Sequence, residues 1–271
     1  MLALVLFLAT ALCYVIATAL VLRCFAGSVE TVRDTAAFIR RSTWLALGAI
    51  LLHAALISSL LEADHFDHLN LTASLSIVSC ILALLVSLRT QGASLLLRPV
   101  VYIFAALAAG LMTSAPVDWG SALGTQPGLI IHIGLSLLAY GVLMLATLYA
   151  IELLYINKLI KQRRARLLSR MIPPLLTVER YFFRLLTLGT LLLIVAIGSG
   201  FVFLNDMFAQ NQAHKTILSL VALALYLIVA LIHKLWGVRG RSVVITAVVA
   251  SAILTLAYFG SRIVKDVIII G

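Results

Sequence analysis

The sequence predicts an all-α, polytopic membrane helix bundle, and three observations lead to this fold class. The chain of 271 residues is 63% hydrophobic, and its mean hydropathy is +1.15. Only 11% of its residues are charged, whereas about 25% is typical of a soluble domain. The net charge of +10 lies in short segments between apolar runs, which favours a lipid bilayer over nucleic acid as the partner of this chain.

Apolar runs of the length of a membrane span occur eight times. A helix needs roughly 20 apolar residues to cross a bilayer, so each run predicts one transmembrane helix. Because no polar stretch is long enough to fold separately, we expect a single transmembrane domain over residues 1–271. The predicted spans are 2–22, 43–61, 71–88, 99–115, 128–154, 185–204, 216–235 and 243–260.

Individual features of the runs refine this prediction. The first run ends at Arg23 and lacks the basic segment of a signal peptide, so it is expected to be a retained span. The fourth run is short, and the fifth is long enough to tilt or to project from the bilayer. Residues 177–180 are expected to begin the helix that leads into the sixth span.

The distribution of basic residues predicts the orientation. Seventeen of the twenty Lys and Arg residues lie in alternate segments, at 23–42, 89–98, 155–184 and 234–242. The opposite segments contain only Lys215, Arg262 and Lys265. Since short basic segments stay on the cytoplasmic side, we expect both termini to lie outside, which agrees with an even number of spans.

His132 is the most informative candidate for a functional site. It lies about five residues into the fifth span, or roughly 7 Å from the outer face at the rise of a helix. Ser136 and Tyr140 follow at spacings that predict one polar stripe pointing in one direction. A buried neutral imidazole can ligate a metal or a heme iron. The alternative is a stripe of hydrogen bonds between helices.

Two further histidines lie in predicted spans. His233 is near the inner end of the seventh span, where it could be a ligand or one member of an interfacial aromatic and basic belt. His53 is in the middle of the second span, where it needs a partner and could be either a ligand or a hydrogen-bonded core residue. His132 and His233 are separated by most of a ~30 Å hydrocarbon core. They cannot ligate the same iron, which requires two nitrogens about 4 Å apart.

The remaining histidines are in or beside the outer segments. His214 begins the seventh span at a depth close to that of His132 and is a possible partner for it. His65 and His68 are alternative partners for His132. They also form a His-x-x-His pattern with Asp64 and Asp67, which could bind a divalent metal weakly but is frequent in hydrated loops without one.

Several spans have motifs that occur together in one family. Residues 132–140 are similar to a helix with the pattern HVxxxxxSY, and residues 226–233 are similar to a helix end with the pattern YxxYLHxR. Between them, residues 189–200 form a glycine-punctuated helix, and residues 257–260 (Ala-Tyr-Phe-Gly) end the last span. By these motifs the chain resembles the cytochrome c assembly (CcsA/CcmC/HemX-like) family of heme-handling membrane proteins, and within it the YpjD group of bacterial inner-membrane proteins.

This resemblance implies heme as a cofactor or cargo in the bacterial inner (plasma) membrane. It implies His132 as an outer heme ligand and His233 as an intramembrane ligand, with His53, His214 and Tyr140 as further cofactor-binding residues. Arg239 and Arg241 would then pair with heme propionates. The tryptophan-rich WWD heme-docking motif of the family is not expected in this chain, since residues 205–208 read Asn-Asp-Met-Phe at its place.

We therefore expect a heme-binding or heme-transport protein related to cytochrome complex assembly, and not an enzyme, since the sequence has no nucleophile–base pair and no carboxylate dyad. The alternative is an accessory or regulatory subunit that uses the same fold to bind another inner-membrane protein. A proton-coupled transporter is disfavoured, because no Asp or Glu lies in the middle of a predicted span.

Overall fold

The computed structural model describes residues 1–25, 32–64, 68–89, 95–116, 121–122, 127–162, 174–203 and 213–260. In these ranges the chain is helical except for two short strands, β1 (His68–Leu69) and β2 (Ser121–Ala122), which pair antiparallel. Each predicted span overlaps one helix, so the all-α prediction is confirmed. The helices are α1 (Leu2–Phe25), α2 (Val32–Ala63), α3 (Leu71–Ser87), α4 (Leu97–Ser114), α5 (Pro127–Lys161), α6 (Leu175–Phe203), α7 (Ala213–Trp236) and α8 (Arg241–Thr255), which continues into a π-helical turn, η2 (Leu256–Gly260).

Seven of these helices are long and apolar enough to cross a membrane, and α3 is a shorter apolar helix of 17 residues. Three helices extend well beyond the predicted spans. Helix α2 begins at Val32 and α5 continues to Lys161, while α6 begins at Leu175, close to the start expected at 177–180. Apolar runs mark only the part of a helix that faces lipid, whereas charged and polar residues continue a helix equally well outside it. The orientation with both termini outside stays a prediction.

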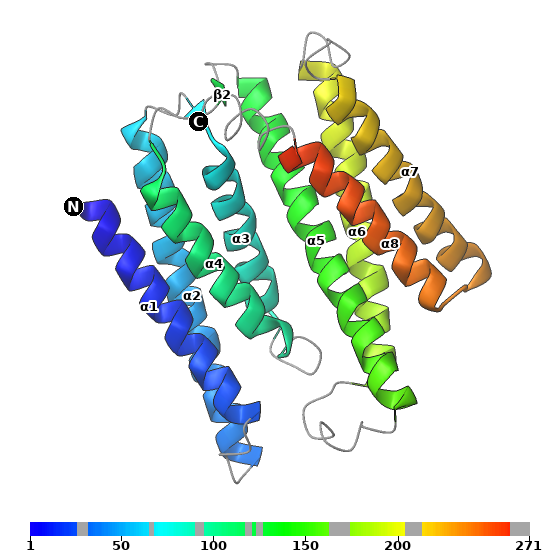
Figure 1. Cartoon of the computed structure of the whole chain (residues 1–271), viewed down its shortest axis with the longest axis horizontal. Coiled ribbons are helices and arrows are strands. Elements are labelled where there is room, and N and C mark those ends of the chain that lie inside the picture. Colours follow the sequence, from blue (N-terminus) through cyan, green and yellow to red (C-terminus); the bar gives the residue numbers. More distant parts are fainter. Residues whose placement is uncertain are drawn as a thin grey trace. The chain divides into compact units, whose positions relative to one another are not determined.

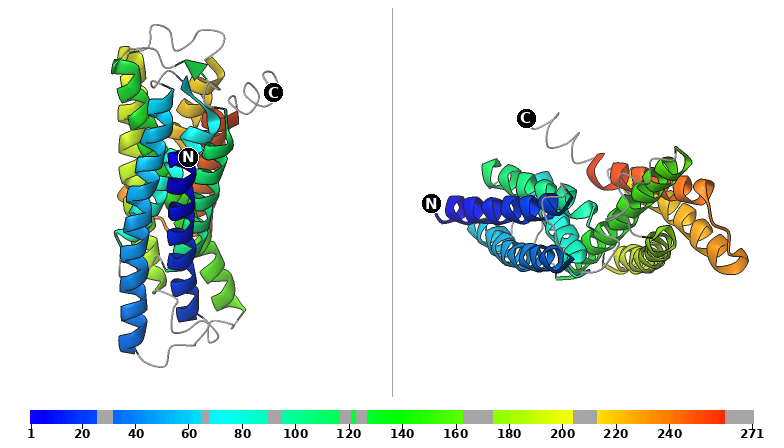
Figure 2. Two further views of the ribbon diagram at one scale, coloured as in Figure 1. Left: turned by 90° about the vertical axis from the view of Figure 1, so that its left-hand side faces the viewer. Right: turned by 90° about the horizontal axis from the view of Figure 1, so that it is seen from below.

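The chain divides into two compact units, Met1–Ala122 (unit 1) and Leu123–Gly271 (unit 2). In unit 1, α1 packs against α2 and α4, and α3 packs against the same two helices. In unit 2, α5 packs against α6 and α8, and α7 packs against the same two helices. Each unit is thus a ring of four consecutive helices that run in alternate directions (Figures 1 and 2). The expectation of one transmembrane domain stays a prediction.

Unit 1 has a buried polar core. The Arg98 side chain, at the start of α4, has no exposed surface and donates hydrogen bonds to Thr43 Oγ1 (3.0 Å) and to the Arg89 carbonyl (2.6 Å). The Tyr102 hydroxyl lies 2.9 Å from Ser87 Oγ, and its ring stacks on Tyr14 of α1. Polar groups away from water are retained only where they find partners, so these contacts hold all four helices of the unit in register.

Unit 2 is organised around the close antiparallel pair α5 and α6. A Cβ atom at Gly189 would lie 2.7 Å from side-chain atoms of Leu143 and 3.3 Å from its backbone nitrogen. At the end of the pair where α5 begins and α6 ends, a Cβ atom at Gly128 would lie 2.5 Å from the Phe203 ring. Small residues allow helix backbones in a membrane to approach closely. These two glycines therefore determine the distance between α5 and α6, and with it how closely His132 of α5 approaches α6.

Replacing Gly189 by alanine is expected to destabilise the protein by about 1–3 kcal/mol, because the added methyl group forces α5 and α6 apart. The matched control is Gly198→Ala on the same helix, where a Cβ atom would have no neighbour within 4 Å. Helical circular dichroism during a denaturing-detergent titration measures both variants. Equal unfolding midpoints for the two alanine variants would contradict the role given to Gly189.

Candidate functional site

His132 of α5 is half-buried against α6. Its Nδ1 atom lies 3.0 Å from the Ala196 carbonyl oxygen and 3.0 Å from Ser199 Oγ. The Ser199 hydroxyl itself donates to the Ala196 carbonyl at 2.7 Å. Since a carbonyl oxygen can only accept a hydrogen bond, the proton of the neutral His132 ring is on Nδ1. Its Nε2 atom therefore carries the lone pair that a metal ligand needs.

This arrangement is the one that supports metal ligation by histidine. In metal sites the second ring nitrogen usually donates its proton to a carboxylate or a backbone carbonyl, which fixes the ring and raises its basicity. Ala196 and Ser199 contact Nδ1 of His132 in this geometry, and sequence reasoning missed both. A backbone carbonyl leaves no signature in a sequence, and Ser199 was concealed in the glycine-punctuated run at 198–200.

Tyr140 lies two turns further along α5 but contacts a different helix. Its hydroxyl is 3.0 Å from Thr255 Oγ1 of α8, and its ring packs on Tyr258 and Phe259 of the π-helical turn, with both centroids at 5.3 Å. The predicted stripe pointing in one direction is therefore wrong. At about 100° per residue, eight residues return to a position roughly 80° away from the start, so His132 faces α6 and Tyr140 faces α8.

His53 is enclosed in the core of unit 1. Its Nε2 atom is 2.8 Å from Ser76 Oγ of α3, its Nδ1 atom is 3.4 Å from the Tyr14 hydroxyl, and the residue has no exposed surface. The structure thus shows the hydrogen-bonded alternative. Because both ring nitrogens already have partners, His53 has none to offer a cofactor in this arrangement.

His233 lies at the other end of unit 2, in the last turn of α7. Its ring stacks on Phe183 of α6 with a centroid distance of 3.4 Å and an angle of 3°, and its Nδ1 atom donates to the Val238 carbonyl at 3.2 Å. The ring thereby closes the turn between α7 and α8. Phe183 and Ala196, which contact His233 and His132, are thirteen residues apart on α6, or roughly 20 Å. The structure thus agrees that His132 and His233 cannot share one iron.

The predicted propionate partners lie beside His233. Arg239 makes an ion pair with Glu179 of α6 at 3.6 Å, and Arg241 is an exposed residue at the start of α8. His214 is exposed in the first turn of α7, at the same end of unit 2 as the start of α5 (Figure 1). It is thus at the level of His132, as expected, although the roles of these residues as ligands stay predictions.

The other sequence-based expectations concern residues that the structure does not describe or describes only in part. His65, Asp67 and residues 205–208 lie outside the described ranges, as does the side chain of His68. Within the described ranges, no three His, Cys, Asp or Glu side chains are grouped so that they could hold a metal ion. A heme iron needs only one or two protein ligands, so this finding does not bear on heme, and the predicted loop metal lies outside the residues that it covers.

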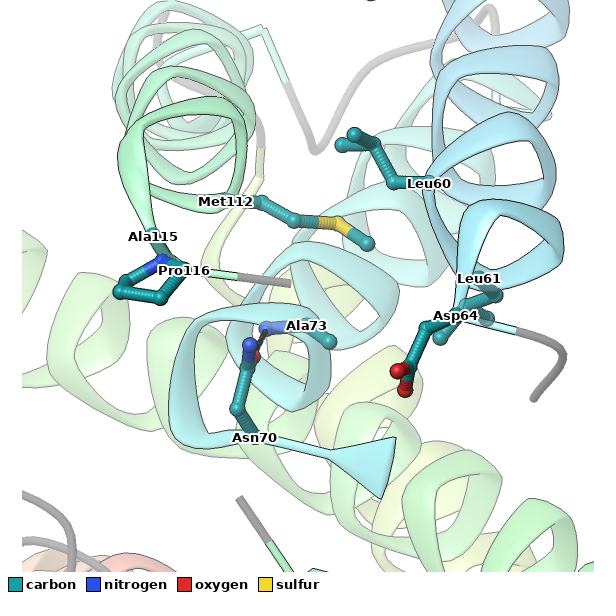
Figure 3. A pocket seen from close by; sticks show the side chains of 8 residues that line it. All are labelled: Leu60, Leu61, Asp64, Asn70, Ala73, Met112, Ala115 and Pro116. Atoms are coloured by element: carbon teal, nitrogen blue, oxygen red, sulfur yellow. Dashed lines mark hydrogen bonds between the residues drawn. The ribbon is translucent and has the colours of Figure 1, made fainter. Parts of the chain in front are cut away.

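A small pocket opens at one end of unit 1 (Figure 3). Met112 extends from α4 toward Leu60 of α2, and Asp64 and Asn70 are the polar side chains that line it. The Asn70 side chain is already used as the N-cap of α3, where it accepts from the Ala73 nitrogen at 2.7 Å. None of the predicted ligands lines this pocket.

Fold and site together define a multi-pass helical membrane protein in which His132 of unit 2 is hydrogen-bonded through Nδ1 to α6. The sequence model described as cytochrome C assembly protein matches residues 41–269. This chain therefore belongs to the cytochrome c assembly protein family. No solved structure matches the chain significantly.

Three curated relatives are similar to this chain. The inner membrane protein YpjD of Escherichia coli strain K12 is 36% identical over 220 residues, which cover 81% of this chain and 82% of the relative. A 28.8 kDa protein of Azospirillum brasilense, named as uncharacterized, is 32% identical over 157 residues, or 57% of each chain. The protein HemX of Brevibacillus brevis is 29% identical over 119 residues, which cover 42% of this chain and 43% of the relative.

Proposed function

We propose that this chain is a heme-binding protein of the bacterial inner membrane, without enzymatic activity, that handles heme in connection with cytochrome c assembly. One observation carries the proposal: His132 donates its Nδ1 proton to the Ala196 carbonyl and so presents Nε2 as a ligand. Family membership supports heme as the group that this nitrogen would bind. The relative named as an inner membrane protein supports the location.

The residues around His132 fit one face of a heme site. The helix pair α5 and α6 holds the ring in a fixed orientation, because Ser199 and Ala196 both contact Nδ1. His214 lies at the same end of unit 2 and is the candidate for a second ligand. Heme supplies an iron with two axial positions, and the chain supplies the imidazole, its orientation and apolar surroundings.

The family's WWD motif belongs to heme docking, and the sequence at 205–208 lacks tryptophan. We therefore propose that the chain holds or passes heme rather than attaching it to an apocytochrome. Binding through the Nε2 of a half-buried histidine agrees with this view, because the ligand remains partly exposed at the surface of unit 2.

The test is the ultraviolet–visible spectrum of protein purified in detergent from heme-replete cells, oxidised and reduced. We expect a Soret band with split low-spin bands on reduction, lost in His132→Ala and kept in His53→Phe. The second variant is the control, because both ring nitrogens of His53 already have hydrogen-bond partners. Absence of a Soret band in every sample, including one from cells supplied with heme, would refute the proposal. The function as an accessory subunit of another inner-membrane protein would then be the better supported proposal.

A further inference from the structure

Basic side chains gather at the end of unit 2 where the start of α6 meets the turn between α7 and α8. Residues 175–184 and 233–241 contain five Lys and Arg residues and one carboxylate, Glu179. All five basic residues are exposed, and they come from three helices and the turn. We call this group the basic collar; its members are Arg180, Arg184, Lys234, Arg239 and Arg241.

The basic collar is built on a rigid frame. Gly237 and Gly240 have φ angles of +62° and +137°, which few other residues adopt, and they shape the turn that carries Arg239. The stack of His233 on Phe183 fixes the end of α7 to α6, and the pair of Arg239 with Glu179 fixes the turn to α6. The backbone segments that carry the charges are therefore fixed relative to one another before any ligand arrives, which lowers the entropic cost of binding one.

The geometry of α6 places two arginines beside this frame. Phe183 faces His233 and Glu179 faces Arg239, so these two residues mark the line along which α6 contacts the turn. Arg180 and Arg184 each follow one of them by one residue, or about 100° around the helix. Being four residues apart, they share one face next to that line.

The surface directly beside the collar is apolar. Leu188, one turn after Arg184, is 51% exposed, and Leu235, next to Lys234, is 64% exposed. Trp236 is 71% exposed at the end of α7, in the position of the interfacial tryptophans of membrane proteins. A charged band that adjoins exposed leucines and a tryptophan matches the boundary between lipid headgroups and acyl chains.

We propose that the basic collar binds the headgroup of an anionic phospholipid. The arginine guanidinium groups fit a phosphate through paired N–H donors, and the glycerol and acyl chains lie along Trp236 and Leu188. A soluble anion would use the charges but not the apolar surface. The site is separate from His132, which lies at the opposite end of unit 2, so it does not depend on heme binding.

Quenching of Trp236 by brominated lipids tests this proposal. The full-length protein, with Trp44 and Trp119 replaced by phenylalanine, is reconstituted into phosphatidylcholine vesicles containing increasing amounts of brominated phosphatidylglycerol or brominated phosphatidylcholine. We expect half-maximal quenching at a mole fraction at least about fivefold lower for phosphatidylglycerol. In Arg180→Gln/Arg184→Gln this preference falls by about fivefold or more, while quenching by phosphatidylcholine stays unchanged and shows that Trp236 is still in place.

The matched control is Arg40→Gln/Arg41→Gln, which removes two exposed charges from α2 of unit 1. It should leave the preference at Trp236 intact. Equal quenching by the two brominated lipids in the unchanged protein would overturn the proposal. So would an equal loss of preference in the two double variants, because it would show general attraction to a basic protein rather than a site at the collar.

Discussion

Replacing Arg98 by alanine is expected to destabilise the protein by about 3–5 kcal/mol, because it removes a wholly buried side chain and leaves its hydrogen-bond partners without a donor. The guanidinium connects Thr43 of α2 and the Arg89 carbonyl after α3 to the start of α4. Its loss therefore loosens three helices of unit 1 and leaves a cavity as large as the side chain. The unfolding midpoint in a denaturing-detergent titration measures the effect.

Two further variants test whether the loss of stability comes from the buried hydrogen bonds of Arg98. Arg41→Ala removes the same charge from an exposed position on α2 and should change stability by less than about 0.5 kcal/mol. Arg98→Lys keeps the charge but loses the planar group that reaches two partners at once, so its stability should lie between those of the alanine variant and the unchanged protein. If Arg98→Ala and Arg41→Ala unfold at the same midpoint, the buried network does not stabilise unit 1.

Replacing His53 by alanine is the second large effect that we expect, at about 2–4 kcal/mol. The ring fills a site with no exposed surface between α1 and α3, and its two nitrogens meet Tyr14 and Ser76. A hydrogen bond between membrane helices is worth about 0.6 kcal/mol on average, so most of the loss comes from the cavity. His53→Phe refills the volume and should recover more than half of it.

The variants His53→Ala and His53→Phe also show whether His53 contributes to heme binding or only to the stability of the fold. Both are expected to bind heme as the unchanged protein does wherever they remain folded, because neither ring nitrogen of His53 is available to a ligand. A Soret band lost in folded His53→Phe would contradict this and would make His53 part of the heme site. The spectrum and the helical signal of the same sample provide the measurement.

The positions of the helices could be predicted from the sequence, because a bilayer imposes one length and one polarity on every span. The early start of α6 was also expected, near residues 177–180. The start of α2 was not: it lies at Val32, eleven residues before the predicted span, since residues outside the bilayer do not need to be apolar. Arg98 was counted with the loop charges, although it is buried at the start of α4. Without it the imbalance is still sixteen to three, so the orientation prediction is unchanged.

The sequence was enough to predict the position of the candidate site, but not the residues that contact its histidine. His132 stands out because a histidine inside a span is rare, whereas its partners belong to α6, more than sixty residues away. The stack of His233 on Phe183 left no signal either, since a phenylalanine before an apolar run is an ordinary residue. Such contacts depend on which helices are neighbours in the bundle. The periodicity of residues along one helix does not reveal its neighbours.

The rings of His132 and His233 are both held by main-chain oxygens, which affects how the protein tolerates mutations around them. Each ring gives its Nδ1 proton to a main-chain oxygen, that of Ala196 or that of Val238. A substitution at either acceptor position changes the side chain but keeps the oxygen. The chemical character of both rings is therefore protected against most single mutations in their surroundings. A change to the histidine itself, or a shift of the helix that carries the acceptor, is what would alter it.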